Sequence, residues 1–266
     1  MINTEKNIPV FNYYPPKGKF IGIVSIPHSG ESLPNEFRTY LTDNTKDLMQ
    51  DVDYRVQELV DINALQQEGI AVIYSNIIRT AIDLNRERSQ CVFNWKNNSK
   101  GNQIVLTEPE HSLIDLWTEK YYSPYYEMLK TMILELQQKQ SIASFVDLHS
   151  MPGKAEEYHL KMNPNQDIIR PDFCISDVHG KSCTPDFIQY ITNALGKSYN
   201  TQINNPYIGG NITKFLDKTY SSLNNIQIEI SRSLYMNEDN KKLKENSALK
   251  KILTSELINL FKHFHD

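Results

Sequence analysis

Cysteine is scarce in this chain of 266 residues, which contains only Cys91, Cys174 and Cys183. Three is an odd number, and no two of these cysteines form a CxxC pair. Small secreted domains that depend on disulfides carry an even set of cysteines, so a disulfide framework is excluded as the basis of the fold. The expected compartment is therefore the reducing cytoplasm.

Long apolar runs and an excess of basic residues are missing as well. No apolar stretch approaches the roughly 18 residues of a membrane-spanning helix, and residues 1–16 lack the basic and apolar regions of a secretory signal. The 28 basic and 32 acidic side chains give a net charge of −4, whereas nucleic-acid binding requires a basic surface. With only 10 glycines and 12 prolines, the chain is not a low-complexity sequence. We expect a soluble domain with neither a membrane nor a nucleic acid as partner.

Short apolar runs alternate with longer amphipathic segments along the chain. The apolar runs predict buried strands at residues 20–26, 71–75, 142–148, 172–176 and 226–230. The amphipathic segments predict helices at 45–68, 109–139 (with a break or kink at Pro124), 184–197 and 238–264. This alternation predicts a single α/β domain over residues 1–266, with its core at about 20–236. Its mixed, mostly parallel sheet should carry helices on both faces.

Residues suited to metal chemistry lie at the ends of predicted strands. His28 follows the first strand, His149 follows the third, and Glu229 lies within the last. Ligands of open α/β sheets collect beyond the carboxyl ends of the strands, so these side chains are expected to lie near one another. Two imidazoles and one carboxylate, with a position left for water, form a hydrolytic zinc site. Glu229 would then be the base that takes a proton from the water.

The third metal ligand is open at this level. Glu31 lies one helical turn past His28, and Asp51 and Asp53 begin an amphipathic segment. Each of these acids is equally consistent with an ordinary solvated helix surface. The metal is open too, since a site of two histidines and a carboxylate accepts divalent ions other than zinc.

A second polar group follows the predicted strand at 71–75. Arg79, Asn85 and Arg86 lie within eight residues of one another. The planar guanidinium of arginine holds a carboxylate in two parallel hydrogen bonds. The segment is therefore a candidate binding site for a substrate carboxylate, although Arg86 and its charged neighbours are also compatible with a solvated cluster.

Eight segments, in one order, resemble the N-formylglutamate amidohydrolase (deformylase) family, which is related to the zinc carboxypeptidase and aspartoacylase superfamily. They are IPHSGESLPNEF (26–37), DVDYRVQELVD (51–61), RTAIDLNRERS (79–89), YYSPYYEML (121–129), VDLHSMPG (146–153), PDFCISDVHGKSC (171–183), NPYIGGNIT (205–213) and IQIEISRSLYM (226–236). The resemblance extends over about residues 20–236. It implies a fold like that of the zinc carboxypeptidases, in the phosphorylase/hydrolase-like class.

The resemblance also implies roles for individual residues. His28 and His149 match the family's metal ligands, and Glu229 matches its catalytic base. Arg79 matches the arginine at the developing oxyanion, while Asn85 and Arg86 match the pair that holds the α-carboxylate. Gly209 and Gly210 match a glycine pair close to the substrate. For the glycine pair, a plain turn is equally consistent.

Position 31 departs from the family pattern. Family members usually have threonine or another non-acidic residue three positions after the first histidine, where this chain has Glu31. The resemblance therefore favours an aspartate as third ligand, Asp53 ahead of Asp51, with Glu31 as the alternative.

The implied activity is zinc-dependent hydrolysis of the amide of a small N-acyl amino acid. The best candidate substrate is N-formyl-L-glutamate, in histidine degradation, and Lys214 or Arg232 would bind its side-chain carboxylate. One alternative is a zinc peptidase or amidase acting on a peptide-like or cell-wall fragment. Another is a non-catalytic relative that binds carboxylates, but such a protein is expected to have lost a ligand or the base.

Overall fold

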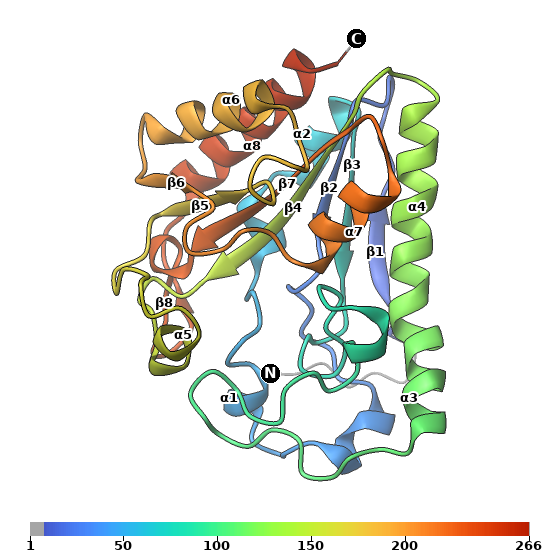
Figure 1. Ribbon diagram of the computed structural model, residues 1–266, viewed down its shortest axis with the longest axis vertical. Coiled ribbons are helices and arrows are strands. Elements are labelled where there is room, and N and C mark those ends of the chain that lie inside the picture. The colour runs from blue at the N-terminus through green and yellow to red at the C-terminus, as the bar shows by residue number, and fades with distance from the viewer. Residues whose placement is uncertain (1–7, 266) are drawn as a thin grey trace.

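A seven-stranded mixed sheet runs through the centre of the molecule (Figure 1). The computed structural model describes residues 8–265. The strand order is β1-β3-β2-β4-β7-β5-β6. The strands are β1 (Phe11–Tyr14), β2 (Gly22–Ile26), β3 (Ile70–Ser75), β4 (Ala143–Met151), β5 (Phe173–Ser176), β6 (Thr201–Ile203) and β7 (Leu223–Ser231). A separate ribbon pairs β8 (Met236–Asn237) with β9 (Lys242–Leu243).

The centre of the sheet is parallel, and each side includes one antiparallel pairing. Strands β3, β2, β4 and β7 are parallel, whereas β1 is antiparallel to β3 and β5 to β7. All five strands expected from the sequence are confirmed. Strands β1 and β6 were not expected, because both are short and only partly buried and so lack a continuous apolar run. Strand β4 extends three residues beyond the expected end, which places His149 inside it.

Helices cover both faces of the sheet, as the sequence predicts. They are α1 (Thr45–Leu48), α2 (Ile62–Gln67), α3 (His111–Trp117), α4 (Ser123–Gln137), α5 (Glu157–Met162), α6 (Pro185–Gly196), α7 (Asn211–Thr219) and α8 (Ser247–His263). Helices α3, α4 and α7 share one apolar core with the sheet, and α2, α6 and α8 share the other. In the described part of the chain, no helix is long and apolar enough to cross a membrane.

The predicted helix over residues 45–68 is wrong. The segment forms the short helices α1 and α2, with an irregular stretch and a 3₁₀ turn between them. Arg55 has φ = 57°, a left-handed conformation that a continuous helix does not contain. Val52, Val56 and Leu59 are fully buried because this stretch folds into the core. Their spacing therefore reflects burial rather than one helical face.

The start of the C-terminal helix differs from the prediction, and the break predicted at Pro124 has a specific form. The predicted C-terminal helix over 238–264 begins only at Ser247, because the β8–β9 ribbon occupies the residues before it. The break expected at Pro124 is a π-helical turn, Thr118–Tyr122, between α3 and α4. Pro124 itself lies in the first turn of α4, directly after this π-helical turn.

The direction in which strands are added to the sheet switches between β2 and β4. The chain passes from β2 to β3 on one side and later adds β4 on the other side of β2. Open α/β sheets bind ligands at such a switch point, beyond the carboxyl ends of the two strands. His28 lies two residues after β2 and His149 lies near the carboxyl end of β4. The topology therefore brings these two histidines together.

Candidate metal centre

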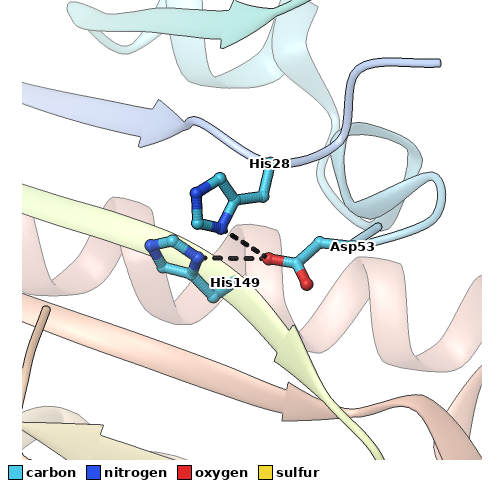
Figure 2. Close-up of side chains that lie close together, drawn as sticks. All are labelled: His28, Asp53 and His149. Carbon is cyan, nitrogen blue, oxygen red and sulfur yellow. Dashed lines mark hydrogen bonds and ion pairs between the residues drawn. The ribbon is translucent and has the colours of Figure 1, made fainter. Parts of the chain in front are cut away.

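His28, Asp53 and His149 form one buried cluster (Figure 2). Each offers a ligand atom, and these atoms all lie within 4.8 Å of one another. Oδ2 of Asp53 is 3.1 Å from Nδ1 of His149 and 3.6 Å from Nδ1 of His28. The three side chains come from the turn after β2, the irregular stretch after α1 and strand β4, so the folded chain creates the cluster.

The second nitrogen of each imidazole faces another carboxylate. Nε2 of His28 lies 2.8 Å from Oδ1 of Asp83, and Nε2 of His149 lies 2.8 Å from Oδ2 of Asp147. Since a carboxylate accepts hydrogen bonds, Nε2 of each ring is placed to donate to its aspartate, and Nδ1 of each ring is directed at Asp53. Metal-binding histidines in proteins have this arrangement, which fixes the ring and its tautomer.

Asp53 divides its two oxygens between cations and imidazoles. Its Oδ1 accepts a hydrogen bond from Nη2 of Arg232 at 3.1 Å and lies 4.0 Å from Nη1 of Arg79, so Oδ2 is left for the histidines. Burial alone would raise the pKa of Asp53, but its contacts with His149 and His28 hold this pKa well below the usual range. The carboxylate is therefore charged at neutral pH, as a metal ligand must be.

The donor set and the two distances from Asp53 are compatible with a tetrahedral divalent-metal site, of which zinc is one example. Ligand atoms at the usual zinc distances of about 2.0–2.2 Å lie about 3.4 Å apart in a tetrahedron. The two distances from Asp53 Oδ2, 3.1 and 3.6 Å, are on either side of that value. Among the described residues, no hydrogen-bond partner reaches the buried Nδ1 of His28, an atom that a metal ion would satisfy.

The other two acids considered as third ligand lie outside this cluster. Glu31 is half-buried, with its Oε1 3.6 Å from Nε of Arg55. Asp51 lines the same cavity as the cluster, but its Oδ2 accepts a hydrogen bond from the backbone N–H of Ser99 at 2.9 Å. The geometry therefore favours Asp53.

Glu229 lies beside the cluster on the neighbouring strand. It is the residue of β7 that pairs with His149 of β4 in the parallel register. Nε2 of Gln227 donates a hydrogen bond to its Oε1 at 2.8 Å. Burial raises the pKa of Glu229 to about 7. A general base works best when its pKa is near the working pH, so this environment suits that role.

The cluster opens into a cavity of about 620 Å³ that Arg79 and Arg86 also line. Nη2 of Arg79 donates to Oδ2 of Asp83 at 3.0 Å, so this arginine is fixed beside the histidines. The guanidinium of Arg86 lies over the ring of Trp95, 5.1 Å from its centroid, and is about one-third exposed. Arg86 is therefore accessible to a ligand in the cavity.

Asn85 and the two glycines form one wall of the cavity. Oδ1 of Asn85 accepts a hydrogen bond from the backbone N–H of Ile212 at 2.8 Å, near the beginning of α7. A Cβ on Gly210 would lie only 2.1 Å from Nδ2 of Asn85, and Gly209 has φ = 106°. The close approach that requires glycine at position 210 is thus to Asn85, and the amide Nδ2 is the group that Asn85 can offer to a ligand.

The two cations considered for a substrate side chain differ in their surroundings. Lys214 is exposed at the edge of the cavity. Arg232 is buried, bound to Asp53 and, through Nε, to Oγ of Ser150 at 3.1 Å. Sequence reasoning did not assign site roles to Asp83, Asp147 or Arg170. For Asp147 a signal existed: it lies two residues before His149 in an apolar strand and therefore on the same face of the sheet.

The fold and the cluster define a class of protein: an α/β domain with a candidate metal centre at the switch point of its sheet. Within this class, a sequence model of the N-formylglutamate amidohydrolase family matches residues 22–236. The chain belongs to this family, as the order of its motifs predicts.

Individual relatives agree with this assignment. The N-formylglutamate deformylase of Pseudomonas putida is 24% identical over 84% of each chain, and that of Pseudomonas aeruginosa is 22% identical over the same shares. The crystal structure of N-formylglutamate amidohydrolase from Ralstonia eutropha JMP134 superposes with a TM-score of 0.84 at 23% identity, over 96% of this chain and 98% of that one. A gene product of Agrobacterium tumefaciens, Atu2144, gives 0.70 at 17% identity, over 96% and 94%. The two structural matches support the fold.

Proposed function

We propose that this protein hydrolyses N-formyl-L-glutamate to formate and L-glutamate, with zinc held by His28, Asp53 and His149. The observation that carries the proposal is the cluster of ligand atoms within 4.8 Å, with Glu229 in register beside it. The names of the Pseudomonas relatives support the choice of substrate. A place in the cytoplasm and in histidine degradation belongs to the same proposal and rests on the family resemblance alone.

Glu229 carries out the proton transfers of the reaction. A bound zinc ion would polarise the carbonyl and lower the pKa of water. Glu229, as a carboxylate, takes one proton from the water whose oxygen attacks the formyl carbon. It then gives this proton to the amide nitrogen as the C–N bond breaks, which releases formate and the free amino group. Gln227, which donates to Glu229, orients the carboxyl group for both transfers.

The arginines orient the substrate and stabilise developing charge. Arg79, fixed by Asp83, donates hydrogen bonds to the carbonyl oxygen as it becomes negative. Arg86, which is accessible over Trp95, holds the α-carboxylate in a bidentate contact, together with Nδ2 of Asn85. Gly210 allows Asn85 to pack against the backbone of the cavity wall, and Gly209 supplies the positive φ of 106° in the turn before it.

A panel of N-formyl, N-acetyl and N-succinyl amino acids tests this function. The zinc-loaded protein should release formate from N-formyl-L-glutamate with the highest kcat/KM of the panel. Amidation of the α-carboxylate should make the substrate poor. If metal-loaded protein hydrolysed no member of the panel, the proposed function would be wrong.

The size of the cavity favours one second candidate, a peptide-like substrate. A volume of about 620 Å³ lies in the range of pockets for drug-sized ligands and is larger than N-formylglutamate alone requires. Short peptides with an acidic residue therefore belong in the same panel. Faster hydrolysis of these peptides than of N-formyl-L-glutamate would identify the activity as that of a peptidase.

A further inference from the structure

Arg170 is a buried arginine that lines the candidate substrate cavity and has no role in the steps above. Its side chain is only 5% exposed. Its backbone N–H donates to the carbonyl of Gly153 at 3.0 Å, beside a bridge between Lys154 and Ile169. The residue therefore lies where the two ends of the segment between β4 and β5 are hydrogen-bonded to each other.

The contacts of the Arg170 guanidinium are with neutral groups. Nη1 donates to the hydroxyl of Tyr207 at 3.0 Å, and Nη2 donates to Oε1 of Gln166 at 2.9 Å. The guanidinium also lies 5.2 Å from the centroid of the Tyr207 ring. Nε has no hydrogen-bond partner among residues 8–265. Tyr207 and Gln166 therefore hold the group in place without neutralising its charge.

Two other arginines that line the cavity have carboxylate partners. Arg79 lies 3.0 Å from Asp83, and Arg232 lies 3.1 Å from Asp53. Within the described part of the chain, no carboxylate oxygen comes within 4.0 Å of the nitrogens of Arg170. A buried charge without a counter-charge is costly, so this site favours an anion supplied by a ligand.

Arg170 and the candidate base share a neighbour. Arg170 lowers the pKa of Tyr207 and Glu229 raises it, on top of the larger effect of burial, which raises this pKa to about 12. Arg170, Tyr207 and Glu229 all line the candidate substrate cavity. A small substrate with its amide beside Glu229 can therefore extend towards Arg170, while Arg86 remains available for a different carboxylate.

We propose that Arg170 binds the side-chain carboxylate of the substrate and so selects N-acyl derivatives of acidic amino acids. This inference rests on the proposed function and deepens it. Arg170 suits the role better than Arg232, whose charge is already paired with Asp53. It also suits the role better than Lys214, because an exposed amine gains little from an ion pair.

The ratio of kcat/KM for N-formyl-L-glutamate to that for N-formyl-L-glutamine measures this selection. Arg170→Gln should lower kcat/KM for the glutamate substrate by about 10- to 100-fold, mainly through KM, since the contact is made in both ground and transition states. For the glutamine substrate the change should stay below about threefold. Arg170→Lys, which keeps the charge but not the planar fork, should retain part of the selection. Arg38→Gln, an exposed arginine elsewhere, is the matched control and should leave both values unchanged.

An equal loss for both substrates, or no loss for either, would overturn the inference. Each ratio is taken on one preparation, so a misfolded fraction cancels. If Arg170→Gln did not fold, Tyr207→Phe, which removes the acceptor of Nη1, should still lower the ratio, and an unchanged ratio would contradict the proposal.

If the parent hydrolysed neither substrate, the proposed function would fail while the inference remained testable by calorimetry. Arg170 should then make L-glutamate bind more tightly than L-glutamine, and Arg170→Gln should abolish the difference. Equal affinities for the parent would overturn the inference.

Discussion

Single residues in this cavity contact two different groups at once. Asp53 directs Oδ1 to Arg232 and Oδ2 to the imidazoles, and each histidine uses one nitrogen for an outer aspartate and the other for the centre of the cluster. Such paired contacts fix the direction of each candidate ligand atom. The roles of neighbouring residues can therefore be separated by single substitutions.

Glu229→Gln should lower kcat for N-formyl-L-glutamate by about 10²- to 10⁴-fold, the usual contribution of a general base. Glutamine keeps the size of the side chain but cannot accept the proton. Zinc content, measured on the same protein, should be unchanged because Glu229 is not one of the three ligands. Glu135→Gln, an exposed glutamate paired with Lys139, is the control and should behave as the parent. Near-normal turnover of Glu229→Gln would show that this glutamate is structural.

The pH dependence of hydrolysis should report the same residue. Burial raises the pKa of Glu229 to about 7, so below pH 7 the carboxyl group is mostly protonated and cannot act as base. We expect kcat/KM to rise with pH, nearly tenfold per unit well below pH 7, and to level off above it. Rates measured from pH 5 to 8.5 check this. A flat profile across that range would contradict the assignment of Glu229 as the base.

Arg86→Lys should raise KM for N-formyl-L-glutamate by about tenfold and leave kcat nearly unchanged. Lysine keeps the charge but loses the bidentate geometry and the stacking on Trp95. Arg88→Lys, two residues away on the exposed surface, is the matched control and should change neither constant. If Arg86→Lys lowered kcat instead, Arg86 would act on the transition state rather than hold the carboxylate.

Part of this site follows from the sequence, for a physical reason. His28, His149 and Glu229 could be singled out because polar residues at the ends of apolar strands are brought to one edge of a parallel sheet. The choice of Asp53 over Asp51 and Glu31 depends on where an irregular stretch folds, which no local pattern encodes. Arg170 was missed because its burial depends on packing against Tyr207 and Gln166, and no local pattern of the sequence encodes these contacts.

At the scale of elements, the stretch that carries Asp53 shows why helical spacing misled the prediction. Leu48 is buried in α1, Val56 in a 3₁₀ turn and Leu65 in α2, so residues on three separate pieces reproduce the spacing of one helix. The backbone N–H of Asp53 donates to the carbonyl of His28 at 3.0 Å. This bond holds the non-helical stretch next to the first histidine, which a continuous helix would not do.

The junction between the glycine pair and α7 should be sensitive to a single methyl group. In Gly210→Ala, the new Cβ would lie within 2.1 Å of Asn85, which must then move and lose its bond to the beginning of α7. We expect a loss of about 1–3 kcal/mol in the free energy of unfolding, measured by urea denaturation, as for other overpacked sites. Gly196→Ala, where a Cβ meets nothing within 4 Å, is the matched control and should not destabilise the protein. Equal stability of the two variants would contradict this packing.

For the whole molecule, the sheet and its two helical layers place four chemical groups at one edge. The ends of β2 and β4 bring the histidines together, β7 adds Glu229, and the segment before β5 adds Arg170. The sequence predicts the layers and the central parallel strands because buried strands are continuous apolar runs. It does not predict the edge strands or the antiparallel direction of β5, because pairing direction depends on how connections run around the sheet.

His28, Asp53 and His149 should hold one catalytic metal ion. Titration of metal-free protein with zinc, with binding and hydrolysis of N-formyl-L-glutamate followed together, tests it most directly. Activity should rise in proportion to added zinc and stop rising at one equivalent, while His149→Ala should neither retain zinc after dialysis nor gain activity. Full activity in protein with no detectable metal, or one equivalent of zinc held by His149→Ala as tightly as by the parent, would contradict it.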